Sequence, residues 1–147
     1  MRATMMLGFA TLALGGCGQP RALAVDHAWV RLPAVPGNPA AAYFTVHGGA
    51  GTVELTGIAT DAAARAEMHQ TIVADLDTHA MAMERVESVT VPAHADIAFA
   101  PGGRHVMLFG LKPGVRAGST VRLTLDFSGT RMTQEARVIA AGDAAPL

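Results

Sequence analysis

Apolar and polar residues alternate over short stretches of the chain. Between positions 120 and 127 every odd-numbered side chain is apolar, and residues 52–60 show a looser form of the same pattern. A period of two residues is typical of a half-buried β-strand, because successive side chains point to opposite faces of a sheet. Short apolar stretches bounded by glycine, proline and other turn residues predict further strands at 23–31, 41–47, 86–91, 97–100, 104–111 and 132–140.

Turn residues separate these stretches. The chain of 147 residues contains 16 glycines and 8 prolines, and it shows no internal repeat. Eight or nine short strands broken by turns predict a single all-β domain, either a sandwich or a small barrel. Residues 62–69 are ambiguous, because their four alanines and Glu67 favour a helix by propensity although the segment is short.

The N-terminus resembles a bacterial lipoprotein signal. An apolar run from Met5 to Leu14 is too short to span a membrane as a helix, and it leads into Leu14-Gly15-Gly16-Cys17. This stretch resembles a lipobox, in which the cysteine becomes the lipidated first residue. The alternative is an ordinary cleavage site that leaves Cys17 as a free thiol.

We therefore expect an extracytoplasmic, periplasmic lipoprotein that is anchored to a membrane through Cys17. The expected organisation is a signal peptide at 1–16, the lipidated cysteine and a short tether at 17–22, a β-sandwich domain at 23–141 and a tail at 142–147.

Charge and composition exclude several function classes. The chain has eleven basic and twelve acidic residues, for a net charge of −1, so it lacks the excess of basic residues that is typical of nucleic-acid-binding proteins. One cysteine cannot form a disulfide within the chain or a four-cysteine metal site. The sequence has no glycine-rich phosphate loop and no recognisable nucleophile–base pair. We predict a binding protein with no enzymatic activity and no small-molecule substrate.

Methionines and histidines occur together. Four of the five methionines after Cys17 are found in the clusters Met68-His69, His79-x-Met81-x-Met83 and His105-x-Met107. In a strand, residues two apart share a face, so His105 and Met107 are predicted to point the same way. Thioethers and imidazoles together suit Cu(I), whereas zinc, calcium and magnesium prefer other ligands. The alternative is that these methionines fill the core. Three histidines lack such neighbours and are expected to be ordinary residues: His27, His47 and His94.

The run from Pro101 to Leu111, PGGRHVMLFGL, carries a family resemblance. Met83 is followed by twenty-one residues and then by His105-x-Met107, a spacing similar to that of the periplasmic copper chaperone family called PCuAC. The resemblance extends over most of residues 25–140. It implies a cupredoxin-like Greek-key β-sandwich that binds Cu(I) through His69, Met83, His105 and Met107. It also implies copper delivery to the CuA centre in subunit II of cytochrome c oxidase or to a Sco-type partner.

One departure from the family pattern concerns the first ligand. Thirteen residues separate His69 from Met83, where the family has ten. We expect the additional residues to form a loop at 71–78, which makes His69 the least constrained ligand. Met68, Met81 and His79 are candidates to replace or supplement it. Two other functions stay open: a copper-buffering or resistance lipoprotein, and a β-sandwich interaction module without metal.

Overall fold

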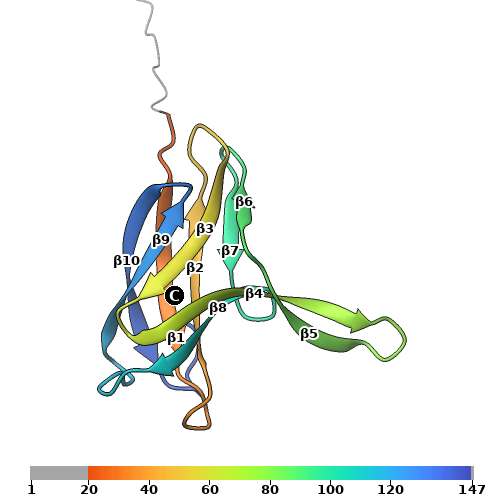
Figure 1. Ribbon diagram of the computed structural model, residues 1–147, viewed down its shortest axis with the longest axis vertical. Coiled ribbons are helices and arrows are strands. Elements are labelled where there is room, and N and C mark those ends of the chain that lie inside the picture. The colour runs from red at the N-terminus through yellow and green to blue at the C-terminus, as the bar shows by residue number, and fades with distance from the viewer. Residues whose placement is uncertain (1–19, 147) are drawn as a thin grey trace, which may run out of the picture.

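The computed structural model describes residues 20–146, and within this range every regular element is a β-strand (Figure 1). The strands are β1 (Ala24–Arg31), β2 (Ala40–His47), β3 (Val53–Thr60), β4 (Ala63–Asp75), β5 (Ala80–Arg85), β6 (Val89–Val91), β7 (Asp96–Phe99), β8 (Arg104–Leu111), β9 (Thr120–Phe127) and β10 (Thr130–Ile139). The described part of the chain has no helix that could cross a membrane. The predicted signal peptide and Cys17 lie outside the described residues.

All ten strands belong to one hydrogen-bonded sheet, in the order β5-β4-β8-β7-β2-β1-β10-β9-β3-β6. Most neighbours are antiparallel, whereas β1 with β10 and β7 with β8 are parallel. The sheet folds over on itself, because β3 packs against β4 although these two strands are far apart in the sheet order (Figure 1). The prediction of one all-β domain is therefore confirmed, and its two layers are parts of a single continuous sheet.

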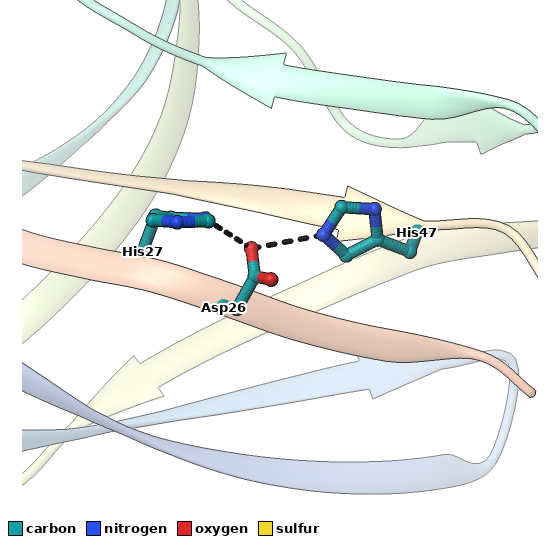
Figure 2. A group of neighbouring side chains, drawn as sticks. All are labelled: Asp26, His27 and His47. Carbon is teal, nitrogen blue, oxygen red and sulfur yellow. Dashed lines mark hydrogen bonds and ion pairs between the residues drawn. The ribbon is translucent and has the colours of Figure 1, made fainter. Parts of the chain in front are cut away.

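A bulge interrupts β1 between Asp26 and Trp29. His27 lies inside the bulge with a φ of 51°, a left-handed conformation that is uncommon for a residue with a side chain. Regular strand geometry would send Asp26 and His27 to opposite faces. The bulge instead lets the two side chains meet, and His47 of β2 approaches Asp26 from the other side (Figure 2).

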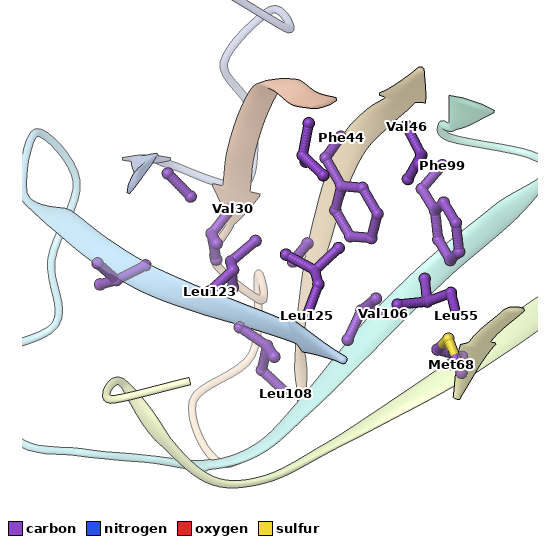
Figure 3. Packing of buried hydrophobic residues seen from close by; sticks show 14 of the residues in the cluster. Val30, Phe44, Val46, Leu55, Met68, Phe99, Val106, Leu108, Leu123 and Leu125 are labelled. Carbon is purple, nitrogen blue, oxygen red and sulfur yellow. The ribbon is translucent and has the colours of Figure 1, made fainter. Parts of the chain in front are cut away.

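The folded sheet encloses one large apolar core. Its side chains come from facing strands and include Phe44 of β2, Leu55 of β3, Met68 of β4 and Leu125 of β9 (Figure 3). Phe44 and Phe99 stack with their ring centroids 4.4 Å apart. Because the odd-numbered residues of β9 point inward, the strict alternation of 120–127 corresponds to the core face of this strand.

β4 resolves one ambiguity and corrects one expectation. Residues 62–69 do not form a helix, since almost the whole stretch belongs to a strand that pairs with β8. The segment expected to be a loop at 71–78 continues this strand to Asp75, and only the tip of the β4–β5 hairpin is a turn. The reason is hydrogen bonding to β8 on one side and to β5 on the other, which outweighs local helix propensity. The far half of this hairpin projects from the body of the molecule (Figure 1).

Asp75 organises the hairpin turn. Its Oδ1 accepts hydrogen bonds from the backbone N–H of Asp77 at 2.8 Å and of Thr78 at 3.0 Å. The bond from Thr78, followed by that from Asp77, lowers the pKa of Asp75. The ionised carboxylate therefore stabilises the turn above the ordinary pKa of aspartate, and this contribution disappears as the pH falls through the lowered pKa.

We expect Asp75→Ala to accelerate amide hydrogen exchange at Asp77 and Thr78 without changing exchange in β9. Asp77→Ala is the matched control, since it removes a carboxylate from the same turn and its side chain accepts no hydrogen bond in the described structure. Acidifying the wild-type protein through the pKa of Asp75 should likewise reduce the protection of these two amides, measured as the exchange rate relative to the intrinsic rate at the same pH. Unchanged exchange rates in Asp75→Ala would contradict this role.

Candidate metal site

Two of the predicted ligands are direct partners on neighbouring strands. In the pairing of β4 with β8, His69 lies opposite His105 and Glu67 lies opposite Met107. The alternate residues Met68 and Val106 point into the core. His69, His105 and Met107 therefore share the outer face of the sheet, as the spacing of His105 and Met107 predicts.

The third strand of the site is β5. Met83 lies opposite Thr71 of β4, two residue pairs farther along the hairpin than His69 and therefore on the same face. Met83, His105 and Met107 line one open pocket, together with Thr71 and Tyr43. Since β4 lies between β5 and β8 in the sheet, the fold brings side chains from three strands to a common place. His69 lies next to this pocket without forming part of its lining.

His105 is held in one orientation. Its Nδ1 lies 3.0 Å from the carbonyl oxygen of Gly103, to which it donates a hydrogen bond, and the residue is 5% exposed. Its Nε2 is buried and has no hydrogen-bond partner. A neutral imidazole that donates through Nδ1 carries its lone pair on Nε2, which is the arrangement usual in histidines that bind metals.

His69 shows the same arrangement with its two ring nitrogens exchanged. Its Nε2 lies 3.2 Å from Oε2 of Glu67, and its Nδ1 is buried without a hydrogen-bond partner. An unpaired buried nitrogen is costly unless something binds it. The rings of His69 and His105 are nearly parallel, with centroids 6.0 Å apart.

Glu67 is a site residue that the sequence interpretation missed. Its other oxygen, Oε1, lies 3.0 Å from Arg65 Nε and 3.8 Å from Arg85 Nη1. The hydrogen bond from His69, with smaller contributions from the two arginines, lowers the pKa of Glu67. An ionised Glu67 therefore fixes the ring of His69. The signal available in the sequence was the spacing Glu67-x-His69, which places both side chains on one face of a strand.

The three alternative ligands lie elsewhere. Met68 is buried in the core on the opposite face of β4, so it cannot replace His69 without unfolding that strand. Met81 lies opposite Val73, two residue pairs beyond Met83 toward the tip of the hairpin. His79 belongs to the turn and has a φ of 54°. The expectation that His69 is the least constrained ligand is also wrong, because strand pairing places it directly opposite His105.

Two imidazoles and two thioethers thus lie on three adjacent strands at the surface. As ligands these side chains would form a soft, uncharged set, which suits Cu(I) better than Zn(II), since zinc prefers thiolate, imidazole and carboxylate ligands.

The sequence of residues 23–138 matches the family described as "LpqE-like: Putative lipoprotein LpqE-like". The chain belongs to this family. A related protein is the "Putative lipoprotein Lxx21020" of Leifsonia xyli subsp. xyli (strain CTCB07), which is 35% identical over 105 residues. The match covers 71% of this chain but only 61% of the length of that relative.

Solved structures with the same fold are PCuAC domains and a related copper protein. The copper(I) form of DR1885 from Deinococcus radiodurans is 27% identical with a TM-score of 0.64, and the match covers 86% of this chain and 85% of that one. The copper-bound PCuAC domain from PmoF2 has a TM-score of 0.64 at 24% identity, covering 83% of this chain and 98% of that domain. The resemblance to the PCuAC family and the cupredoxin-like fold that it implies are thereby confirmed.

Proposed function

We propose that this LpqE-like protein binds Cu(I) through His69, Met83, His105 and Met107 and passes the ion to another protein. The observation that carries the proposal is the pair of neighbouring histidines. Each has one ring nitrogen engaged by a fixed acceptor and the other buried without a partner, beside a pocket lined by two thioethers. A site designed only for stability would leave no such nitrogens unpaired.

Transfer by ligand exchange fits the exposure of the site. His105 is buried, whereas Met83 is 63% exposed and lies on the projecting hairpin. An incoming thiolate or imidazole could displace Met83 first, while the histidines still hold the ion. The family resemblance favours the CuA centre of cytochrome c oxidase, or a Sco-type protein, as the acceptor. Binding and exchange of this kind require no catalytic step.

The test is a titration of the metal-free protein with Cu(I) under reducing conditions, in competition with Zn(II). We expect one equivalent of Cu(I) to bind, and an excess of Zn(II) not to displace it, because thioethers are poor zinc ligands. Acidification should weaken binding, since imidazole must be neutral to bind a metal. Tight zinc binding without displacement by Cu(I) would contradict the proposal.

Transfer separates a chaperone from a copper buffer. The Cu(I)-loaded protein is mixed with the apo form of the soluble CuA domain of oxidase subunit II, or with an apo Sco-type protein, and the copper content of each is measured after separation. A chaperone transfers copper to the acceptor faster than a small-molecule chelator that binds Cu(I) with the same affinity. A copper buffer retains its copper in this experiment. If the protein is a buffer, a strain that lacks the protein still assembles an active oxidase.

We also propose that Cys17 is lipidated and that it holds the domain at a membrane outside the cytoplasm. The lipobox-like sequence supports this proposal, as does the lipoprotein name of the family and of the relative from Leifsonia xyli. Cys17→Ser should prevent acylation and remove the protein from the membrane fraction, or leave an unprocessed precursor. Wild-type protein recovered free in the periplasm with an intact Cys17 thiol would disprove lipidation.

A further inference from the structure

A second cluster of potential ligands lies where the chain enters the domain. Oδ1 of Asp26 lies 2.6 Å from His27 Nδ1 and 2.9 Å from His47 Nε2, so one carboxylate oxygen lies between two imidazoles (Figure 2). Ligand atoms from these three residues all lie within 4.8 Å of one another. Two ligand atoms bound about 2.1 Å from a single ion are at most about 4.2 Å apart, so small side-chain movements would bring the three residues to one ion.

His47 is oriented by a second carboxylate. Asp96 of β7 lies opposite His47 in the sheet, and its Oδ1 is 2.8 Å from His47 Nδ1. When Nδ1 donates to Asp96, the lone pair of His47 lies on Nε2, facing Asp26. This Nε2 is buried and has no aligned hydrogen-bond partner, despite its short distance to Asp26. Metal-binding histidines typically have this arrangement, in which a carboxylate accepts a hydrogen bond from one ring nitrogen and the other ring nitrogen faces the metal.

The charges around the cluster favour a cation. Asp26 and Asp96 supply two negative charges, and Arg21, which is paired with Asp96, supplies one positive charge. With both histidines neutral the cluster therefore has a net charge of −1.

The backbone of β1 is distorted at this cluster. His27 adopts its positive φ in the bulge, a strained conformation for a residue with a Cβ atom. Without the bulge, His27 would point away from Asp26 and the cluster would lose one of its imidazoles. Bulges frequently redirect a side chain next to a functional site.

We propose that Asp26, His27 and His47 form a second metal site, which binds a divalent transition-metal ion, Cu(II) in preference to Zn(II). Two imidazole nitrogens and one carboxylate oxygen are ligands for ions of this class, and Cu(II) stands above Zn(II) in the general affinity order. Asp96 is a positioning residue that fixes the ring of His47. The exposure of His27, whose side chain is 69% accessible, leaves an open path to the site.

This site is distinct from the Met/His site. Ala41 at the start of β2 lines the Met/His pocket, and His47 ends the same strand six residues later on the same face. At 3.3 Å per residue His47 lies about 20 Å along the strand from Ala41 and about 13 Å from Tyr43, which also lines the pocket. The two sites also differ in chemistry, since only the Met/His site contains sulfur. The proposal is therefore independent of Cu(I) binding.

The test is Cu(II) binding to the full protein without a reductant, followed by equilibrium dialysis and electron paramagnetic resonance. We expect one tightly bound Cu(II), with hyperfine coupling from two nitrogens, and weaker binding of Zn(II) at the same place. His27→Asn should lower the Cu(II) affinity at least tenfold. Asparagine tolerates the left-handed backbone of residue 27, so this variant should still fold. Asp96→Asn should weaken binding and change the spectrum while all three ligands remain.

His94→Asn is the matched control. His94 is also exposed and also has a positive φ, of 59°, but it lies outside the cluster. The His94→Asn variant should bind Cu(II) with the affinity of the wild type. The proposal is overturned if His27→Asn and His47→Gln both retain wild-type Cu(II) affinity, or if His105→Ala is the variant that abolishes the Cu(II) spectrum. Loss of Cu(I) binding in His105→Ala with intact Cu(II) binding would support two separate sites.

Discussion

His105→Ala should abolish Cu(I) binding or weaken it at least tenfold, which corresponds to about 1.4 kcal/mol. His105 is the ligand most firmly held by the fold, because Gly103 fixes its ring and its free Nε2 is buried beside Met107 and Met83. Met107→Ala should have a similar effect, since its thioether shares the same face of β8. Affinity is measured by competition with a coloured Cu(I) chelator.

The matched control for this experiment is again His94→Asn, which removes an exposed imidazole that does not line the pocket and should leave the Cu(I) affinity unchanged. Glu67→Gln provides a second comparison, because it keeps all four proposed ligands but weakens the contact that orients His69. We expect an intermediate loss of affinity for this variant. Wild-type Cu(I) affinity in both His105→Ala and Met107→Ala would show that the pocket is not the copper site.

Met68→Ala should destabilise the fold by about 2–5 kcal/mol, the usual cost of removing a large buried side chain. Met68 is 4% exposed and packs in the central core, whereas Met83 is 63% exposed on the hairpin (Figure 3). Met83→Ala should therefore lower the Cu(I) affinity with little change in the free energy of unfolding. Both quantities are measured on both variants, by chelator competition and by chemical denaturation.

These two methionines separate the two interpretations of the methionine-rich sequence. If Met83→Ala strongly destabilises the protein and leaves copper binding intact, the methionine is a core residue and the non-metal interaction module becomes the better description. If Met68→Ala leaves stability unchanged and impairs copper binding, the assignment of faces on β4 is wrong. Met68→Leu, which preserves the buried volume, should restore most of the stability.

Local patterns of apolar and polar residues in the sequence predicted much of this fold. The alternation in 120–127 identified β9 together with its buried face, and the His105-x-Met107 spacing placed both residues on one face of β8. β4 was harder, because its alanine-rich start has helix propensity and its strand character comes from pairing with β8 and β5. Such pairing joins residues that are distant in sequence, so no local window reveals it.

The sites show the same limit. That His69 lies opposite His105 depends on the register between two strands more than thirty residues apart, which no local sequence pattern reveals. The contact between Asp26 and His27 could not be predicted for a different reason. Adjacent residues in a regular strand point apart, and only the bulge in β1 brings these two side chains together. His47 joins them through the pairing of β1 with β2.

The most direct test of the copper site is nuclear magnetic resonance of the methionine methyl groups during a titration with Cu(I). The account predicts that the methyl signals of Met83 and Met107 shift in proportion to the first equivalent of copper. The signals of Met68, which is in the core, and of Met132, which packs against it, should stay in place. Shifts confined to other methionines, or binding of one equivalent without any methyl shift, would contradict the Met/His site.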